Sequence, residues 1–469
     1  MDELENLETM DYEALQEKQN DELMTLLDQH NMKELKLRME DMNEFDLAEF
    51  LSEIDDKREA MVFRLLSKER AAEVFANFEP PDQEKIINSI TDSELAGIVE
   101  ELYVDDAVDM MEELPANVVK RVMRAATPQT RDLINQYLNY PENSAGSIMT
   151  AEFVDLKKYM SVKDAFARIR RIGEDKETIY ICFVTSSDRK LEGIVTVKDL
   201  LLADPDTIIE DLMDRNVIYA VTTEDQESVS EKFSDYDLMA LPVVDKENRL
   251  VGIVTVDDVI DVMEQEATED IQLMAGMTPS DKPYLRTGTT EMWRNRIPWL
   301  LFLMLSATFT SMILTSFEDM LAVQAGLVAF IPMLMGTGGN SGAQASTAVI
   351  RSLSLGDVEP GDVLRVMWKE WRVAFLCGLT LCAVNFVKML LVDGMLLGNG
   401  NVTVAVAATV SLSIVFIVMF AKVVGSFLPI AAEKIGVDPA VMANPLISTL
   451  TDAVSLLIYI YVAKLILKI

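Results

Sequence analysis

The stretch Asn444 to Leu467, NPLISTLTDAVSLLIYIYVAKLIL, predicts a helix that crosses a lipid bilayer, because about 20 apolar residues suffice to span one. Asn444 followed by Pro445 is typical of an N-cap with proline at the first helical position. Asp452 lies about two turns into this helix. No Lys, Arg or His occurs within ten residues of it to neutralise its charge.

An isolated carboxylate at membrane depth costs several kcal/mol and usually faces a water-filled pathway or a partner. We therefore interpret Asp452 as the residue that selects cations in a pore. This stretch alone leaves two other environments open. The carboxyl group could be protonated inside a helix bundle, or it could lie near the membrane interface.

Charge divides the chain of 469 residues into two parts. Residues 297–469 carry 9 Lys or Arg and 10 Asp or Glu, whereas residues 1–296 carry 32 and 67. So acidic a front part should attract cations and repel nucleic acid, which we do not expect as a partner. The polar N-terminus shows no export signal, so we expect this front part in the cytoplasm.

The composition argues against an enzyme. The chain has one histidine, His30, and three cysteines without metal-binding spacing. These numbers speak against His-based catalysis, against zinc sites and against a disulfide framework. We also find no nucleophile–base pair and no phosphate-binding loop.

A repeat of 24 residues runs through the front part. Leu47, Ala71 and Leu95 form one column of the repeat, and Leu51, Phe75 and Val99 form another. Short helices at a fixed period stack into a solenoid. We expect an all-α superhelical domain over residues 1–138, with residues 1–40 as one charged amphipathic helix.

One helix of this solenoid, residues 104–113 (VDDAVDMMEE), is unusually acidic. Asp105 and Asp109 are four residues apart and share a helix face, where like charges are destabilising unless a cation relieves them. A solvated helix face explains the same pattern, and the segment by itself favours that explanation.

Residues 139–262 contain one pattern twice, 59 residues apart. The runs LEGIVTVKDL (191–200) and LVGIVTVDDV (250–259) each predict a strand leading into a helix with an acid at its start. Their order resembles a tandem pair of CBS domains, which implies an α/β fold. CBS pairs often bind adenine nucleotides, so the resemblance implies ATP as a possible ligand, with an acid at the position of Asp199 or Asp258 contacting its ribose. A scaffold that only dimerises remains the alternative.

A strongly acidic helix follows. Between residues 257 and 270 the acids are Asp257, Asp258, Asp261, Glu264, Glu266, Glu269 and Asp270. Solubility alone explains such an acidic helix poorly so close to membrane spans. We interpret residues 263–290 as a cation-responsive connecting helix and linker.

Five apolar stretches predict an all-α membrane domain over residues 291–469. They are residues 297–316, 321–350, 371–392, 402–432 and 443–466. The link after the second stretch carries Arg351, Arg365, Lys369 and Arg372, whereas links 317–320 and 393–401 carry no Lys or Arg. Because positive loops stay inside, we expect a multi-pass cell-membrane protein with a cytoplasmic N-terminus.

The second stretch contains GTGGNSGAQ at residues 336–344. We expect these glycines to interrupt the helix, with Asn340 and Gln344 lining a wet cavity where irregular backbone is tolerated. Close helix packing through small residues is the alternative.

These features together resemble the MgtE-type magnesium channels and transporters over nearly the whole chain. The specific residues are the run 336–344 and the run from Val437-Asp438-Pro439 through Asn444-Pro445-Leu446 to Asp452. The resemblance implies a homodimer whose two Asp452 carboxylates bind hydrated Mg²⁺ in one pore. It also implies that backbone oxygens near Asn444 and Ser448 face the same ion.

The resemblance further implies that cytoplasmic Mg²⁺ closes the pore by bridging acids of the soluble part. The positions that we expect to take part are Asp105, Asp106, Asp109, Glu227, Asp237, Asp258, Asp261, Glu266, Glu269 and Asp270. Mg²⁺ prefers one or two carboxylates and keeps several waters, which suits a pore without thiolate or imidazole ligands. Two alternatives stay open: transport of Mn²⁺ or Co²⁺, and a membrane-anchored nucleotide sensor without transport.

Overall fold

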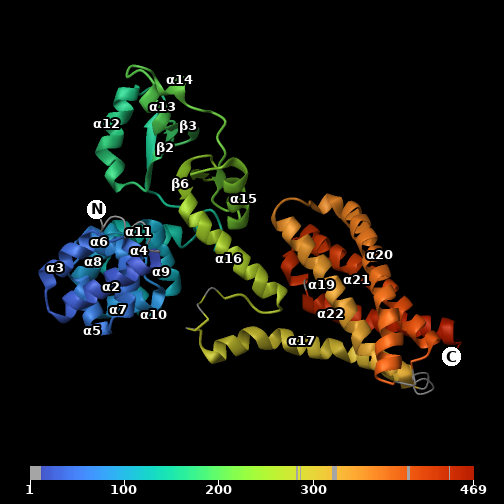
Figure 1. Ribbon diagram of the computed structural model, residues 1–469. Helices are drawn as coiled ribbons and strands as arrows, with labels where there is room; N and C mark the ends of the chain where they lie inside the picture. Colours follow the sequence, from blue (N-terminus) through green and yellow to red (C-terminus); the bar gives the residue numbers. More distant parts are fainter. Residues whose placement is uncertain are drawn as a thin grey trace, which may run out of the picture. The chain divides into compact units, whose positions relative to one another are not determined.

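The computed structural model describes residues 12–280, 282, 284–285, 287–318, 325–398, 402–442 and 444–468 (Figure 1). The chain divides into two compact units, Met1–Val262 and Met263–Ile469. Each unit has its own hydrophobic core.

Ten helices open the described part of the first unit. They are α2 (Tyr12–Asp28), α3 (Met32–Glu40), α4 (Glu44–Glu53), α5 (Asp56–Phe63), α6 (Lys68–Ala76), α7 (Pro80–Ser89), α8 (Asp92–Glu101), α9 (Val104–Glu113), α10 (Ala116–Ala125) and α11 (Pro128–Tyr137). The expectation of one helix over residues 1–40 is wrong for the described part, because the chain turns at His30, with φ 56°. The Asn31 side chain then caps α3 by accepting a hydrogen bond from the Glu34 amide.

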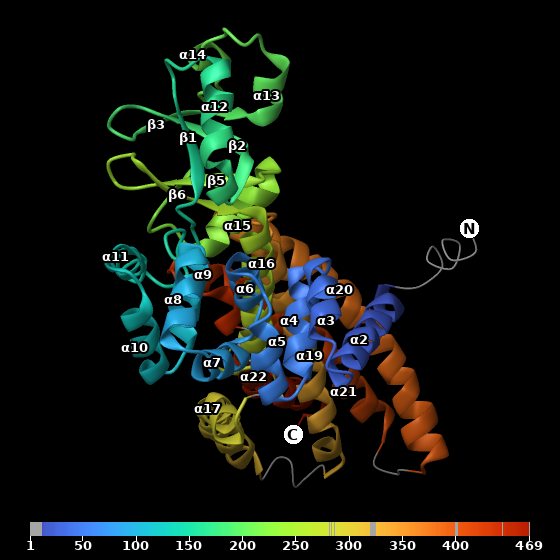
Figure 2. The same cartoon turned by 90° about the vertical axis from the view of Figure 1, so that its left-hand side faces the viewer.

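The predicted repeat is confirmed, and its unit is a pair of helices. Helices α4, α6, α8 and α10 begin at residues 44, 68, 92 and 116, and the helices between them begin at 56, 80, 104 and 128. Members of the predicted columns, such as Leu47, Phe75 and Val99, are buried in the core that these helices share. Figure 2 shows the stack from the side.

Two similar α/β halves follow. The first contains β1 (Phe153–Lys157), α12 (Val162–Ile172), the short 3-10 helix η1 (Gly173–Asp175), β2 (Thr178–Thr185), β3 (Leu191–Thr196) and α13 (Val197–Leu202). The second contains α14 (Ile209–Leu212), β4 (Ala220–Val221), α15 (Gln226–Tyr236), β5 (Ala240–Val244) and β6 (Leu250–Thr255). In each sheet the first two strands are parallel and the last two antiparallel. Isolated β-bridges also join the two halves. Thr150 of the first half pairs with Ile253 of the second, and Asp214 of the second pairs with Ile194 of the first.

Helix α16 (Val256–Met274) begins directly after β6, and the boundary between the two units falls within it. The second unit continues with α17 (Thr289–Ser316), η2 (Ala325–Phe330), α19 (Ile331–Ser354), η3 (Pro360–Asp362), α20 (Val363–Lys388), the π-helical η4 (Met389–Leu396), α21 (Val404–Lys434), η5 (Pro439–Met442) and α22 (Asn444–Leu467). The predicted class of fold is therefore confirmed: a helical front domain, an α/β pair and a helical C-terminal part.

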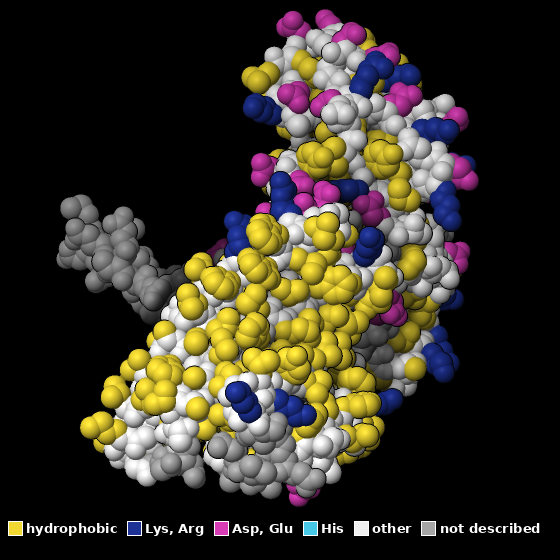
Figure 3. Space-filling model, turned by 90° about the vertical axis from the view of Figure 1, so that its right-hand side faces the viewer, with side chains coloured by type: hydrophobic (Ala, Val, Ile, Leu, Met, Phe, Trp, Pro, Cys, Tyr) yellow, Lys and Arg dark blue, Asp and Glu magenta, His cyan; other side chains and the backbone are white. Residues whose placement is uncertain are grey.

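Several helices of the second unit suit a membrane. Within the described residues, four helices are long and apolar enough to span one: α17, α20, α21 and α22, the last with η5. Helix α19, with 24 residues, corresponds to the remaining expected span, and residues 321–324 of that span lie outside the described ones. Hydrophobic side chains cover a broad face of this unit (Figure 3). Its exposed large hydrophobic residues include Leu305, Phe309 and Leu376.

The expected interruption at residues 336–344 is wrong, because α19 runs through the glycines without a break. The glycines serve close packing instead. A Cβ on Gly338 would lie 2.6 Å from Ser455 Oγ, and one on Gly342 would lie 2.6 Å from Ile447 Cγ2. The alternative of packing through small residues therefore holds.

Candidate functional site

The first candidate site lies on helix α22. Asn444, Ser448 and Asp452 are spaced by four residues, so they follow one another along one face of the helix. Proline at the second position of α22 fits the expected start at Asn444 to within one residue. Ser448 and Asp452 are half-buried. Within the described residues no Lys or Arg forms an ion pair with Asp452.

The glycine run of α19 brings two backbones together beside this face. Ser448 Oγ lies 3.4 Å from the position that a Cβ on Gly339 would take, and Thr451 Cγ2 lies 3.5 Å from the corresponding position on Gly342. Asp452 follows Thr451 directly in the chain and lies one helical turn after Ser448.

Asn340 and Gln344 lie on the other side of α19. Both side chains are exposed in the single chain, whereas Gly338, Gly339 and Gly342 are buried. The two amides share a face, as the sequence predicted, and their lining of a wet cavity stays a prediction. They lie on a surface that lipid, water or a second subunit would cover.

The end of α16 packs against the ends of two membrane helices within the second unit. Leu273 forms an apolar cluster with Ile350 of α19 and Ala440 of η5. Gly276, with φ +70°, follows, and a Cβ there would lie 2.9 Å from Pro445 Cγ. The connecting helix is thus in contact with the segments that begin α22 and end α19.

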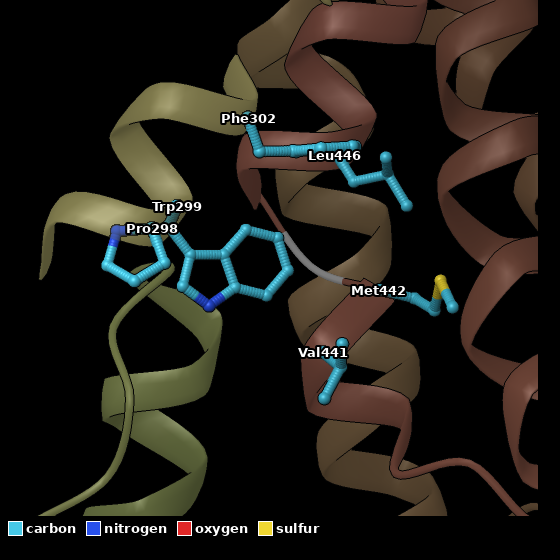
Figure 4. A pocket seen from close by; sticks show the side chains of 6 residues that line it. All are labelled: Pro298, Trp299, Phe302, Val441, Met442 and Leu446. Carbon is cyan, nitrogen blue, oxygen red and sulfur yellow. The ribbon is translucent and has the colours of Figure 1, made fainter. Parts of the chain in front are cut away.

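An apolar cavity of about 370 Å³ lies beside this junction (Figure 4). It is lined by Pro298, Trp299, Phe302, Val441, Met442 and Leu446. Its lining offers almost no oxygen ligands, so the cavity is unsuited to a hard cation.

The second candidate site lies in the first unit, between α9 and the first turn of α16. Asp105, Asp106 and Asp109 of α9 all experience the charge of Asp258 on α16. The Asp258 carboxylate accepts a 2.6 Å hydrogen bond from Thr255 Oγ1. Asp105 Oδ1 is buried without a hydrogen-bond partner in the described chain, which is the kind of atom that a cation or its water would satisfy.

These acids disfavour one another's charge. Burial, followed by repulsion from Asp106 and Asp258, raises the pKa of Asp105 well above its usual value. Burial and neighbouring carboxylates raise the pKa of Asp106 to about 6 and that of Asp109 to about 7. Burial, followed by the charge of Asp257, raises the pKa of Asp258 to about 6, against the hydrogen bonds from Thr255. A divalent cation between the helices would relieve this repulsion.

Two further acids of this cluster were missed by the sequence reasoning. Glu152 directly precedes β1, and Glu177 directly precedes β2. The Glu177 amide donates a hydrogen bond to the Glu152 carbonyl oxygen, 2.9 Å away. Burial and the charges of Asp257 and Asp258 raise the pKa of Glu177 to about 7. Both glutamates lie far from α9 in the sequence, so only the fold brings them to α9.

Within the described residues, no three His, Cys, Asp or Glu side chains converge closely enough to hold a bare ion. Mg²⁺ gives up its waters reluctantly, and its sites usually combine one or two carboxylates with several waters.

The remaining predicted acids occupy separate places. Glu227 lies in the first turn of α15 and Asp237 at its C-cap, with φ 51°, so about 15 Å of helix separates them. Asp261, Glu266, Glu269 and Asp270 lie along α16. Burial, followed by repulsion from the charges of Asp438 and Glu266, raises the pKa of Asp270 to about 6. The positive charge of Arg351 acts in the opposite direction. Asp438 lies in the loop before α22, and nothing in its sequence surroundings indicates a contact with α16.

Asp199 has a structural role in α13. It is the N3 residue of a capping box, in which its carboxylate accepts from the Thr196 amide and hydroxyl. A cavity of about 500 Å³ in the α/β pair is lined by residues that include Asp155, Arg168 and Lys176 but not Asp199. Nucleotide binding through Asp199 stays a prediction.

Comparison with known proteins gives matches along the chain. Residues 331–462 match the family model of a divalent cation transporter. Residues 42–143 match the MgtE intracellular N domain, and residues 145–206 and 209–265 each match a CBS domain. The magnesium transporter MgtE of Thermus thermophilus is 38% identical over 458 residues, covering 97% of this chain and 100% of that protein.

Two other similarities agree. The magnesium transporter MgtE of Bacillus subtilis is 30% identical over 441 residues, covering 94% of this chain and 96% of that protein. The crystal structure of the soluble part of a magnesium transporter matches with a TM-score of 0.52 and 30% identity. That match covers 54% of this chain and 99% of the other.

Proposed function

The chain belongs to the MgtE family of divalent cation transporters, and on this premise we propose that it carries Mg²⁺ across the cell membrane through a pore lined by Asn444, Ser448 and Asp452. The observation that carries the proposal is their alignment on α22 beside the glycine run of α19. The family is one of transporters, so the expectation that the chain is not an enzyme is confirmed. The chain is a multi-pass membrane protein.

Its soluble domains lie in the cytoplasm and its two subunits share one pore. The cytoplasmic side is supported by Arg351, Arg365 and Lys369, which cluster in the link between α19 and α20. A second subunit is supported by the exposed face of α19 with Asn340 and Gln344. Two copies of Asp452 would attract a divalent ion more strongly than a monovalent one.

Cytoplasmic Mg²⁺ closes this pore by binding among acids of the soluble part and of α16. The support is the mutual repulsion of Asp105, Asp106, Asp109 and Asp258, which a cation would reverse. The contact of Leu273 with Ile350 and Ala440 gives α16 a direct mechanical connection to the pore helices. A switch of this kind needs higher affinity for Mg²⁺ in the closed state, and several weak acidic sites together supply it.

The test is Mg²⁺ uptake into vesicles that contain the full-length chain, its Asp452→Asn variant and a matched Asp393→Asn control. Asp393 lies in η4 and pairs with Lys388 at 2.9 Å, away from α22. We expect uptake by the native chain and the control, and about tenfold slower uptake by Asp452→Asn, which corresponds to a barrier raised by about 1.4 kcal/mol.

Three results would contradict the proposal. Equal uptake by Asp452→Asn would remove the pore assignment. Absence of uptake by a folded native chain would favour a nucleotide sensor without transport. Stronger uptake of Mn²⁺ or Co²⁺ than of Mg²⁺ in competition would change the substrate.

A further inference from the structure

Lys422 is a buried cation in the middle of α21. Its side chain is among the buried ones of this helix, with 6% of the residue exposed. A lysine at membrane depth is costly and is kept where it pairs with another group. Its Nζ lies 3.9 Å from Glu370 Oε2 on the neighbouring helix α20, and the two side chains are 7% and 16% exposed.

This ion pair lies at one end of the contact between α20 and α21. At the other end, the buried Asn385 Nδ2 donates to Ser411 Oγ at 2.9 Å. Between them, a Cβ on Gly378 would lie 3.1 Å from Val415 Cα, so the two backbones are in close contact. Polar contacts at both ends and a glycine in the middle fix the register of these antiparallel helices.

The neighbouring residue of α21 packs against the glycine run of α19, next to α22. The carbonyl oxygen of Ala421 lies 3.2 Å from the position of a Cβ on Gly342, and Thr451 Cγ2 lies 3.5 Å from the same point. Lys422 follows Ala421 in the chain, and Asp452 follows Thr451. An uncompensated ammonium at this level would act on cations beside Asp452 across a medium of low dielectric constant.

We propose that Glu370 and Lys422 form an ion pair that fixes α21 behind the pore and cancels a positive charge that would otherwise repel Mg²⁺ from Asp452. The inference rests on the proposed function, because it assigns a positioning role in the same ion path. A divalent ion experiences twice the repulsion of a monovalent one, so the pair matters most for the proposed substrate.

The experiment measures Mg²⁺ uptake against Mg²⁺ concentration for the native chain, Glu370→Gln, Lys422→Met and the double variant, with Asp393→Asn as control. Glu370→Gln leaves Lys422 charged and should raise the half-saturating Mg²⁺ concentration about tenfold. Lys422→Met should lower it, because Glu370 then adds attraction. The double variant should return within about twofold of the native value, since a neutral pair of similar size replaces a buried ion pair well.

Asp393→Asn breaks a different ion pair, between Asp393 and Lys388, whose side chain is more exposed than that of Lys422. This control should leave the half-saturating Mg²⁺ concentration unchanged. Shifts of the same sign in Glu370→Gln and Lys422→Met, or losses of maximal uptake and melting temperature without any shift, would overturn the charge role. If Glu370→Gln does not fold, Lys422→Met and the double variant still decide the sign. Failure of the native chain to take up Mg²⁺ would instead remove the proposed function.

Discussion

Asp105 shows how one residue can report the state of the acidic cluster. Its Oδ1 atom has no hydrogen-bond partner in the described chain, and burial with the charges of Asp106 and Asp258 raises its pKa. Asparagine has nearly the same shape without the charge. We therefore expect Asp105→Asn to stabilise α9 when Mg²⁺ is absent and to reduce the stabilisation that added Mg²⁺ brings.

The measurement is hydrogen exchange of α8 to α10 in the full-length protein, with and without millimolar Mg²⁺. Glu101→Gln is the matched control, because Glu101 is an exposed acid at the end of α8. Asp105→Asn should slow exchange in α9 without Mg²⁺ severalfold, whereas the control should match the native chain. Faster exchange in Asp105→Asn, or an undiminished response to Mg²⁺, would contradict the role of the cluster.

At the scale of elements, the contact of α19 with α21 depends on residues without side chains. A Cβ on Gly425 of α21 would collide with the Gly342 carbonyl oxygen, which is a backbone atom that cannot move aside. We expect Gly425→Ala to separate the helices, to lower the melting temperature by several degrees and to slow Mg²⁺ uptake. Cavities and strain in a packed interior cost roughly 1–3 kcal/mol.

Gly336 provides the control for this substitution. It lies in α19, the helix against which Gly425 packs, and nothing lies within 4 Å of the place that its Cβ would take. Gly336→Ala should keep or raise the melting temperature, since alanine favours a helix by about 1 kcal/mol over glycine. Equal melting temperatures for both variants would show that close packing at Gly425 is unimportant.

At the scale of the whole molecule, the acidic charge makes stability depend on pH. The pKa values of Asp106, Asp109, Asp258 and Glu177 are raised to about 6 or 7 in the folded protein. The folded state therefore binds more protons than the unfolded state between about pH 4 and 7, so its stability falls as the pH rises through that window. Above that pH window, Mg²⁺ takes the place of the protons that neutralise these carboxylates.

We accordingly expect the unit Met1–Val262 in the full-length protein to lose stability from about pH 5 to 7.5 without Mg²⁺. Millimolar Mg²⁺ should remove most of this loss, by mass action on the folded state. Hydrogen-exchange protection factors measure the loss of stability with pH and its removal by Mg²⁺. They are corrected for the pH dependence of the intrinsic exchange rate. Stability that rises over this range without Mg²⁺ would contradict the raised pKa values, and an equal loss with Mg²⁺ would contradict binding.

The sequence by itself determined the features that repeat or persist along the chain. Hydropathy marked the apolar helices, the 24-residue period marked paired helices, and the twin GIVTV runs marked the α/β halves. Each is a local pattern, because a helix or strand must present an apolar face at its own period to be buried. The same reasoning singled out Asp452, since an unpaired acid in an apolar run is visible without a fold.

Only the tertiary structure decided which distant residues meet. Glu152 and Glu177 join the acids of α9, and Lys422 meets Glu370, because of how strands and helices pair, and no spacing in the sequence records this. The glycines at 336–344 were ambiguous for the same reason. A glycine that weakens an isolated helix is retained in a continuous one when a neighbouring backbone occupies the space of the missing side chain, and that neighbour is known only once the helices have packed.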